Sequence, residues 1–186
     1  MTLLDLGVVL LIVIYVALGW WTGTVRRVIG LVAVYIGLLV AFNMGPQGGG
    51  ILEQSQPGLS FADARFISWS FFLVLMLLVF EGAATAVHAQ LQVAVLALNK
   101  GIGVLIGLVT AVVLVTAIVY MLAGFGKPVG KQPDRLQITV RDAVVNSALG
   151  LPLAKAAGDF ILPLLSAALP RDPQAYFALE GTGTQP

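Results

Sequence analysis

Four long apolar runs constrain the fold of this chain more than any other feature. The runs cover residues 3–21, 28–44, 66–84 and 102–122. A helix rises about 1.5 Å per residue, so about 20 apolar residues cross the ~30 Å hydrocarbon core of a bilayer. Backbone groups cannot stay unpaired in lipid, and each run is therefore expected to form a helix. We predict an all-α, polytopic membrane protein whose four transmembrane helices lie within residues 1–126.

Composition argues against a soluble fold. Hydrophobic residues make up 59% of the 186 residues and charged residues 10%, whereas about a quarter of an average soluble domain is charged. A domain of this size has too much surface for its volume to hide so many apolar side chains from water. The net charge of +1 provides no basic field for nucleic acid, and we expect no nucleic-acid partner.

Glycine, proline and polar residues mark where these runs end. A short hinge at residues 22–27 separates the first two runs. Gly45 and Pro46 follow the second run and are expected to stop its helix. Residues 85–100 are mostly apolar but carry a histidine and two glutamines. We expect this stretch to extend the third helix or to lie in the interface, and a fifth crossing there stays open.

The C-terminal part is expected to lie on the membrane rather than to cross it. Residues 127–170 are predicted to form an amphipathic, interfacial helical tail. Within it, residues 152–169 place apolar side chains on one helix face, and Lys155 and Asp159 form a pair on the other. Residues 171–186 are expected to be flexible.

The basic residues give conflicting signals about orientation. Arg26 and Arg27 lie in the shortest loop, so the positive-inside rule places that loop in the cytoplasm and both termini outside it. Contact with anionic lipid headgroups is a secondary role for both arginines. The basic residues of the tail would then be exported, although acidic residues accompany them. We favour extracytoplasmic termini because the first helices usually dominate orientation; a fifth crossing would remove the conflict.

Three ionisable residues are candidates for polar function: Asp5, Glu81 and His88. Glu81 lies near the end of the third run, where an ionisable group is costly in lipid and suggests a function. The alternative is a place at headgroup level, facing water or His88. His88 follows Glu81 by two helical turns, which leaves a proton relay through the pair open. Asp5 is expected to complement the helix dipole, and its spacing from Thr2 is that of a capping box.

Glycines at four-residue spacing are the candidates for helix packing. Small residues at this spacing share a helix face and let two helices approach closely in a bilayer. The candidates are Gly19, Gly23, Gly103 and Gly107.

Side chains suited to catalysis are scarce. The chain has one histidine and no cysteine, so most nucleophile–base pairs and transition-metal sites cannot be built from it. The GxSxG, HExxH and P-loop lysine patterns are also missing. We expect no enzyme activity, no metal and no cofactor. The expected partners are the lipid bilayer and either another membrane protein or further copies of the chain.

The order of several features is typical of a known family. Asp5 precedes the first apolar run, and the glycine–basic hinge at 23–27 leads into a helix rich in small residues. Residues 98–107 combine a polar residue, a basic residue and a GxxxG pattern, and residues 147–152 begin an apolar tail punctuated by serine and proline. Over residues 3–169 the chain resembles the colicin V production protein (CvpA) family of bacterial inner-membrane proteins. Asn99 stands where an aspartate is usual in that family.

The resemblance implies a four-helix inner-membrane protein associated with toxin (colicin V) production or export and with envelope homeostasis. It brings no catalytic residue with it. Two functional hypotheses follow: an accessory or scaffold protein acting through helix–helix contacts, and a small oligomeric channel or transporter. The scaffold is favoured because the predicted spans offer few polar side chains for a path.

Overall fold

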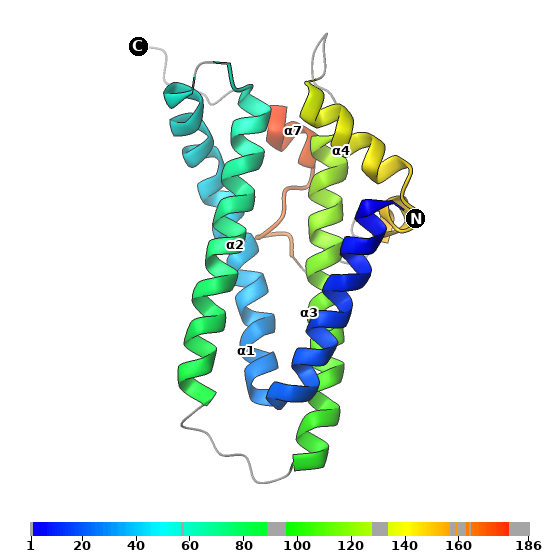
Figure 1. The fold of residues 1–186 in the computed structure, drawn as a ribbon. Coiled ribbons are helices and arrows are strands. Elements are labelled where there is room, and N and C mark those ends of the chain that lie inside the picture. Colours follow the sequence, from blue (N-terminus) through cyan, green and yellow to red (C-terminus); the bar gives the residue numbers. More distant parts are fainter. Residues whose placement is uncertain are drawn as a thin grey trace.

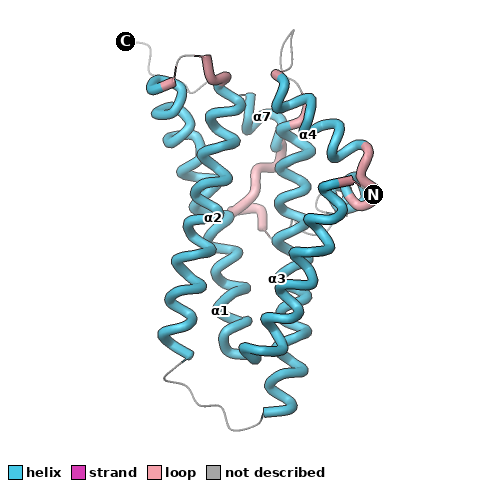
Figure 2. The backbone as a smooth tube through the Cα atoms, in the orientation of Figure 1, coloured by secondary structure: helices cyan, strands magenta, loops and turns pink. Residues whose placement is uncertain are grey.

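The computed structural model describes most of the chain. Described are residues 2–56, 58–88, 96–127, 134–156, 159, 163 and 165–178, with the backbone alone for residues 86–88 and 96–98. The described residues form helices joined by short loops and contain no strand (Figure 2). The predicted all-α class is therefore confirmed for this part of the chain.

Three helices are long and apolar enough to cross a membrane. The helices are α1 (Leu3–Ser55), α2 (Phe61–His88), α3 (Leu96–Phe125), α4 (Arg135–Val145), α5 (Gly150–Ala156) and α7 (Pro173–Ala178). The candidate spans are Leu3–Ser55, Phe61–Thr85 and Asn99–Phe125. Figure 1 shows α2 and α3 running along the length of the molecule, with the shorter α4 and α7 gathered at one end.

Helix α1 is a helical hairpin rather than a straight rod. Its 53 residues would extend about 80 Å if straight, more than twice the hydrocarbon thickness. The backbone instead leaves the helical region at Gly23, with φ 73° and ψ −175°. Figure 1 shows the chain descending in dark blue, turning, and ascending in lighter blue. We call residues 3–22 the first arm, residues 24–55 the second arm, and the turning end the hinge end.

The two arms hold α2 and α3 in place. The first arm lies against α3, where Gly19 meets Gly103, and the second arm lies against α2, where Gly49 meets Arg65. By contrast, the described parts of α2 and α3 make few direct contacts with each other. Both arms contribute to one apolar core with α2 and α3, which includes Val34, Leu38, Leu73, Leu114 and Met121.

The second arm continues beyond the point where we expected it to end. Gly45 and Pro46 were expected to stop this helix, but α1 runs through both to Ser55. Pro46 cannot donate the amide hydrogen bond that the Phe42 carbonyl would accept in a regular helix. The hydroxyl of Tyr176 donates to that carbonyl oxygen at 3.1 Å. A contact from the far end of the chain thus replaces the missing donor.

The tail differs from a single interfacial helix. Helices α4 and α5 both contact α3, and α5 ends at Ala156. Beyond it, Leu165, Ala168 and Leu169 are buried in the core, and Figure 2 shows the loop before α7 drawn inside the outline of the helices. Non-helical backbone at membrane depth is tolerated only where protein or trapped water covers it. The buried loop packs in the core and would meet that condition in a bilayer.

Part of the expected flexible terminus is also packed. We expected residues 171–186 to be flexible, yet Tyr176 and Phe177 in α7 are buried. Phe177 stacks edge-on against Phe125 at 5.4 Å between ring centroids. Residues 179–186 lie outside the described residues, as do residues 89–95 of the stretch for which a fifth crossing stayed open.

Candidate functional site

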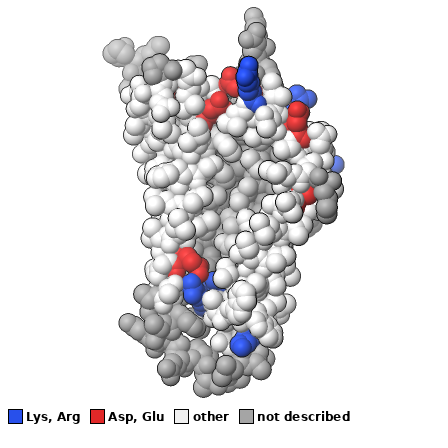
Figure 3. Space-filling view, in the orientation of Figure 1, with Lys and Arg blue, Asp and Glu red and all other residues white. Residues whose placement is uncertain are grey.

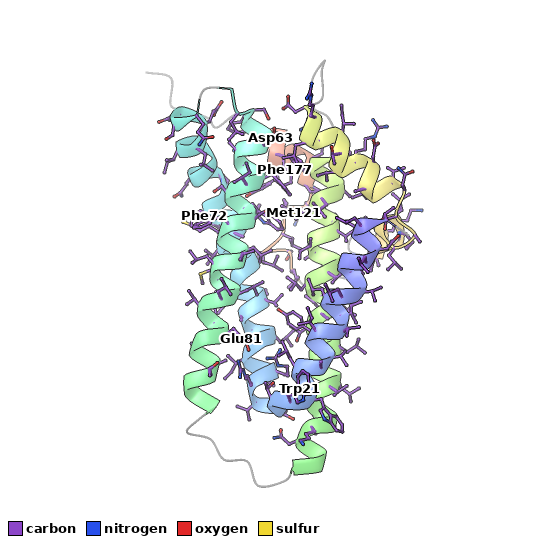
Figure 4. All side chains as sticks on the ribbon, viewed as in Figure 1. Trp21, Asp63, Phe72, Glu81, Met121 and Phe177 are labelled. Carbon is purple, nitrogen blue, oxygen red and sulfur yellow. The ribbon has the colours of Figure 1, made fainter. Side chains whose placement is uncertain are left out.

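Charged and polar side chains from three helices meet at the hinge end. The hinge site, as we name it, consists of Thr22, Thr24, Arg26, Arg27, Glu81 and Asn99, which come from α1, α2 and α3. Figure 4 labels Glu81 close to the turn of α1, with Trp21 below it. In Figure 3 the same end shows red and blue atoms beneath a white middle.

Glu81 bridges the two arginines of the hinge. One of its carboxylate oxygens, Oε1, accepts a hydrogen bond from Arg26 Nη2 and lies 3.3 Å from Arg27 Nη2. The side chain of Glu81 is 39% exposed, that of Arg26 18% and that of Arg27 only 1%. From the sequence we expected Glu81 either to have a polar function or to face water or His88, and we expected the two arginines to set the orientation. The structure brings all three charges together.

Arg27 is the most deeply buried charge of the site. Its Nε donates to Thr22 Oγ1 at 3.1 Å, and its guanidinium carbon lies 5.9 Å from the centre of the Tyr15 ring. A buried charge is costly unless it is paired and hydrogen-bonded. Thr22, Tyr15 and Glu81 together supply that compensation. These contacts allow the guanidinium group of Arg27 to be buried inside this end of the bundle.

Asn99 fixes the geometry of the turn. Its Oδ1 accepts from the backbone N–H of Thr24 at 2.8 Å, and its backbone carbonyl accepts from Thr24 Oγ1 at 2.8 Å. The positive φ of Gly23 is one that residues with a side chain rarely adopt. A Cβ at Gly23 would also lie 2.7 Å from Asn99 Nδ2. The turn therefore depends on a glycine at 23 and a side-chain acceptor at 99.

Glycines bring the first arm and α3 into backbone contact. A Cβ added to Gly19 would lie 2.4 Å from the Gly103 carbonyl oxygen, and one added to Gly103 would lie 2.5 Å from the Gly19 carbonyl oxygen. At Gly107 it would lie 2.5 Å from the carbonyl oxygen of Tyr15. Real Cβ atoms do not approach that closely. The proposed packing glycines thus lie together at this crossing, with Gly23 at its end.

A second row of small residues was not singled out from the sequence. Gly37, Ala41, Gly45 and Gly49 recur every four residues along the second arm and are buried. A Cβ at Gly49 would lie 2.9 Å from the Cα of Arg65, so the second arm and α2 also approach closely. The spacing was visible in the sequence. A helix that stopped at Gly45 would have left Gly49 outside this row, whereas α1 continues through both.

Asp5 lies away from the hinge end and serves a different contact. Its side chain completes the expected capping box with Thr2 and also accepts from Ser147 Oγ and, at 3.1 Å, from the Leu149 N–H. Asp5 is 1% exposed. It joins the first arm to the start of α5. The structure does not bring Asp5 and Glu81 together.

A third polar cluster anchors α7 in the bundle. Arg65 Nη1 donates to the carbonyl oxygen of Tyr176, and the Arg65 guanidinium carbon lies 4.4 Å from the centre of the Phe61 ring. Gly45 leaves room for the Tyr176 hydroxyl, which a Cβ there would meet at 2.4 Å. Burial raises the pKa of Tyr176 above its ordinary value. The hydroxyl thus stays protonated and can donate.

Metal-binding side chains do not gather anywhere in the part of the chain that the structure describes. They contain no group of three or more histidine, cysteine or acidic side chains placed to hold a metal ion. The side chain of His88 lies outside the described residues, so nothing here bears on the proton relay through Glu81 that the sequence left open. The hinge site is suited to holding charge and joining helices.

The described part of the chain has long apolar helices, polar groups near the ends of the bundle and two glycine crossings. These features are typical of one class, the helical membrane proteins. Within that class, residues 4–158 match the family described as Colicin V production protein. The chain belongs to this family, as the resemblance in its sequence implied. No curated protein and no solved structure matches the chain. The buried loop and α7, at residues 165–178, lie beyond the matched residues.

Proposed function

We propose that this protein is an accessory or scaffold protein of the bacterial inner membrane that takes part in colicin V-type toxin production or secretion and in envelope homeostasis. Family membership supports the link to colicin V production. The observation that carries the scaffold role is the interior of the bundle, which is close-packed and apolar between separate polar clusters. Such an interior suits a protein that acts through its outer helix faces.

Among the described residues of one subunit, apolar side chains fill the core between the polar clusters and leave no continuous polar path. Val34 and Leu38 are completely buried midway along the second arm, and Leu114 of α3 packs in the same cluster. Thr110 is a polar side chain inside this region, and its hydroxyl bonds back to the Ile106 carbonyl at 2.7 Å. Its hydrogen-bonding capacity serves the helix itself. Transport through one subunit would require this core to open.

An outer pocket offers a place for a partner helix. It lies between the second arm and α2, has a volume of about 320 Å³, and is lined by Gly48, Ile51, Leu52, Ile67, Ser68, Phe71 and Phe72. Ile51 and Phe71 are exposed around it. The buried hydroxyl of Ser68 has no hydrogen-bond partner among the described residues. Small residues and serine hydroxyls at such surfaces support close helix association in bilayers.

The proposal includes four crossings and an orientation. Each arm of α1 would cross the membrane, since about 20 residues suffice and the arms hold 20 and 32 residues by their ranges. The hinge end would face the cytoplasm because of Arg26 and Arg27. The N-terminus and α7 would then lie on the extracytoplasmic side. We expect no enzyme activity.

Photocrosslinking in cells tests the scaffold role. A crosslinking residue at Phe71, beside the outer pocket, should capture another membrane protein or a second copy of the chain. The same residue at Leu38, which is buried, is the matched control and should give only bonds within the chain. Lipid adducts alone at Phe71, together with ion flux in liposomes that Glu81→Gln abolishes, would favour a channel instead.

A further inference from the structure

The hinge end carries more positive charge than its single carboxylate can balance. Among the described side chains at this end, Glu81 is the only carboxylate, and it faces Arg26 and Arg27 together. Lys100 adds a third cation and forms no ion pair with a described carboxylate. One negative charge shared by two guanidinium groups leaves a net positive charge, to which the ammonium of Lys100 adds.

Aromatic side chains flank these cations where a bilayer interface is expected. The Lys100 ammonium lies 5.6 Å from the centre of the Trp20 ring. Trp20 is 54% exposed and Trp21 75% exposed. Tryptophan prefers the headgroup level, where its ring is amphipathic. Lys100 therefore lies beside a ring that is expected at the depth of lipid headgroups.

Arg26 retains donor capacity at the same end. Its Nη2 is used by Glu81 and its Nε is buried, but 18% of the side chain is exposed, so part of the guanidinium group is open to an anion outside the protein. Arg27, in contrast, is enclosed by Thr22, Tyr15 and Glu81. Arg26 and Lys100 are thus the two cations with capacity left for an external anion. Guanidinium and ammonium groups both suit phosphate oxygens.

We propose that the hinge end is a binding site for the phosphate headgroup of an anionic membrane lipid, held by Lys100 and Arg26 beside Trp20. The charge surplus and the interfacial tryptophans both favour a lipid over a soluble ion. Basic side chains at a membrane surface attract anionic lipids. The site does not depend on the scaffold role, because it concerns the purified protein and its bilayer alone.

Tryptophan quenching by brominated lipids provides a direct test. The Trp21→Phe protein keeps Trp20 at the site and the buried Trp69 in the core, so a change in quenching reports on Trp20. In vesicles of phosphatidylcholine mixed with brominated phosphatidylglycerol, we expect stronger quenching than with brominated phosphatidylcholine at the same fraction. The relative association constant for the anionic lipid should fall about fivefold in Lys100→Gln, and less in Arg26→Gln, whose charge Glu81 partly balances.

The control places the same charge change on the opposite side of the molecule. Lys155→Gln removes an exposed lysine of α5 and should leave the quenching unchanged. Circular dichroism would establish that each variant is folded. Equal quenching by both lipids in the parent protein would overturn the proposal, as would equal effects of the two lysine variants. Displacement of the lipid by millimolar glycerol phosphate would overturn the assignment to a lipid and indicate a site for soluble phosphate.

Discussion

Replacing Glu81 with glutamine should destabilise the bundle through Arg27 rather than through Arg26. Glutamine keeps the size and one acceptor oxygen of the side chain but removes its charge. Arg27 would then remain buried, at 1% exposure, without a counter-charge. Arg26 is more exposed and can turn toward water or lipid headgroups. The loss of the carboxylate charge should therefore matter more for the buried Arg27 than for the more exposed Arg26.

The expected cost follows from burial and distance. Breaking a fully buried ion pair costs about 3–5 kcal/mol, because a charge is left uncompensated. Glu81 is 39% exposed, so solvent screens its attraction to Arg27, and exposed pairs contribute about 0–1 kcal/mol. The bond from Arg27 to Thr22 survives the change. We expect Glu81→Gln to lower the free energy of unfolding by about 1–3 kcal/mol.

A double-mutant cycle in reconstituted or detergent-solubilised protein measures the coupling. Unfolding by a denaturing detergent would be followed for Glu81→Gln, Arg27→Gln and the double variant. Residues in one salt-bridge network couple by about 0.5–3 kcal/mol, so the double variant should lose less than the sum of the single changes. Glu53→Gln is the matched control, since Glu53 is exposed near the other end of α1 and forms no ion pair with a described residue. Additive losses from Glu81 and Arg27 would refute the reasoning.

Three further predictions concern other contacts. Gly103→Ala should destabilise the protein by about 1–3 kcal/mol, because the added Cβ would lie 2.5 Å from a carbonyl oxygen of the first arm. In the control, Gly101→Ala, the added Cβ meets nothing within 4 Å, so this change should be neutral or stabilising. Equal melting temperatures of the two variants would contradict the close crossing. Tyr176→Phe should cost about 1 kcal/mol, and less after Pro46→Ala restores an amide donor. Equal costs in the two backgrounds would show that the hydroxyl does not replace that donor. Topology reporters after residues 55 and 178 should both give extracytoplasmic signals, and cytoplasmic signals at both would reverse the orientation.

Local signals were sufficient to predict the long apolar helices and the turn of α1, but not the end of its second arm or the helices of the tail. Hydropathy and length act within one helix, and the conformational freedom of Gly23 acts within the turn itself. The pairing of Arg26 with Glu81 could not be predicted in this way, since it joins residues 55 positions apart. Either residue alone is consistent with an interfacial charge. Only the arrangement of the arms decides which charges meet.

Pro46 shows how a distant contact can override a local signal. Gly45 and Pro46 are a valid stop for an isolated helix, because the proline leaves a carbonyl without its donor. Whether the helix stops depends on another donor reaching that carbonyl. Tyr176 does so from α7, in a segment that was expected to be flexible. The contact between Tyr176 and Phe42 therefore explains both why the helix continues through Pro46 and why residues 173–178 are ordered.

The ends of the bundle are held by different interactions, and this difference has a physical consequence. The hinge end relies on charges, of which Glu81 and Arg26 are partly open to solvent. The end that holds α7 relies on aromatic packing and on hydroxyl or guanidinium donors to backbone carbonyls, as in the bond from Tyr120 to the Arg171 carbonyl at 2.8 Å. The Debye length falls from about 10 Å at 0.1 M salt to about 3 Å at 1 M, so molar salt weakens ion pairs between partly exposed charges but hardly affects buried hydrogen bonds to neutral carbonyls. High salt should therefore loosen the hinge end first, while α7 stays in place.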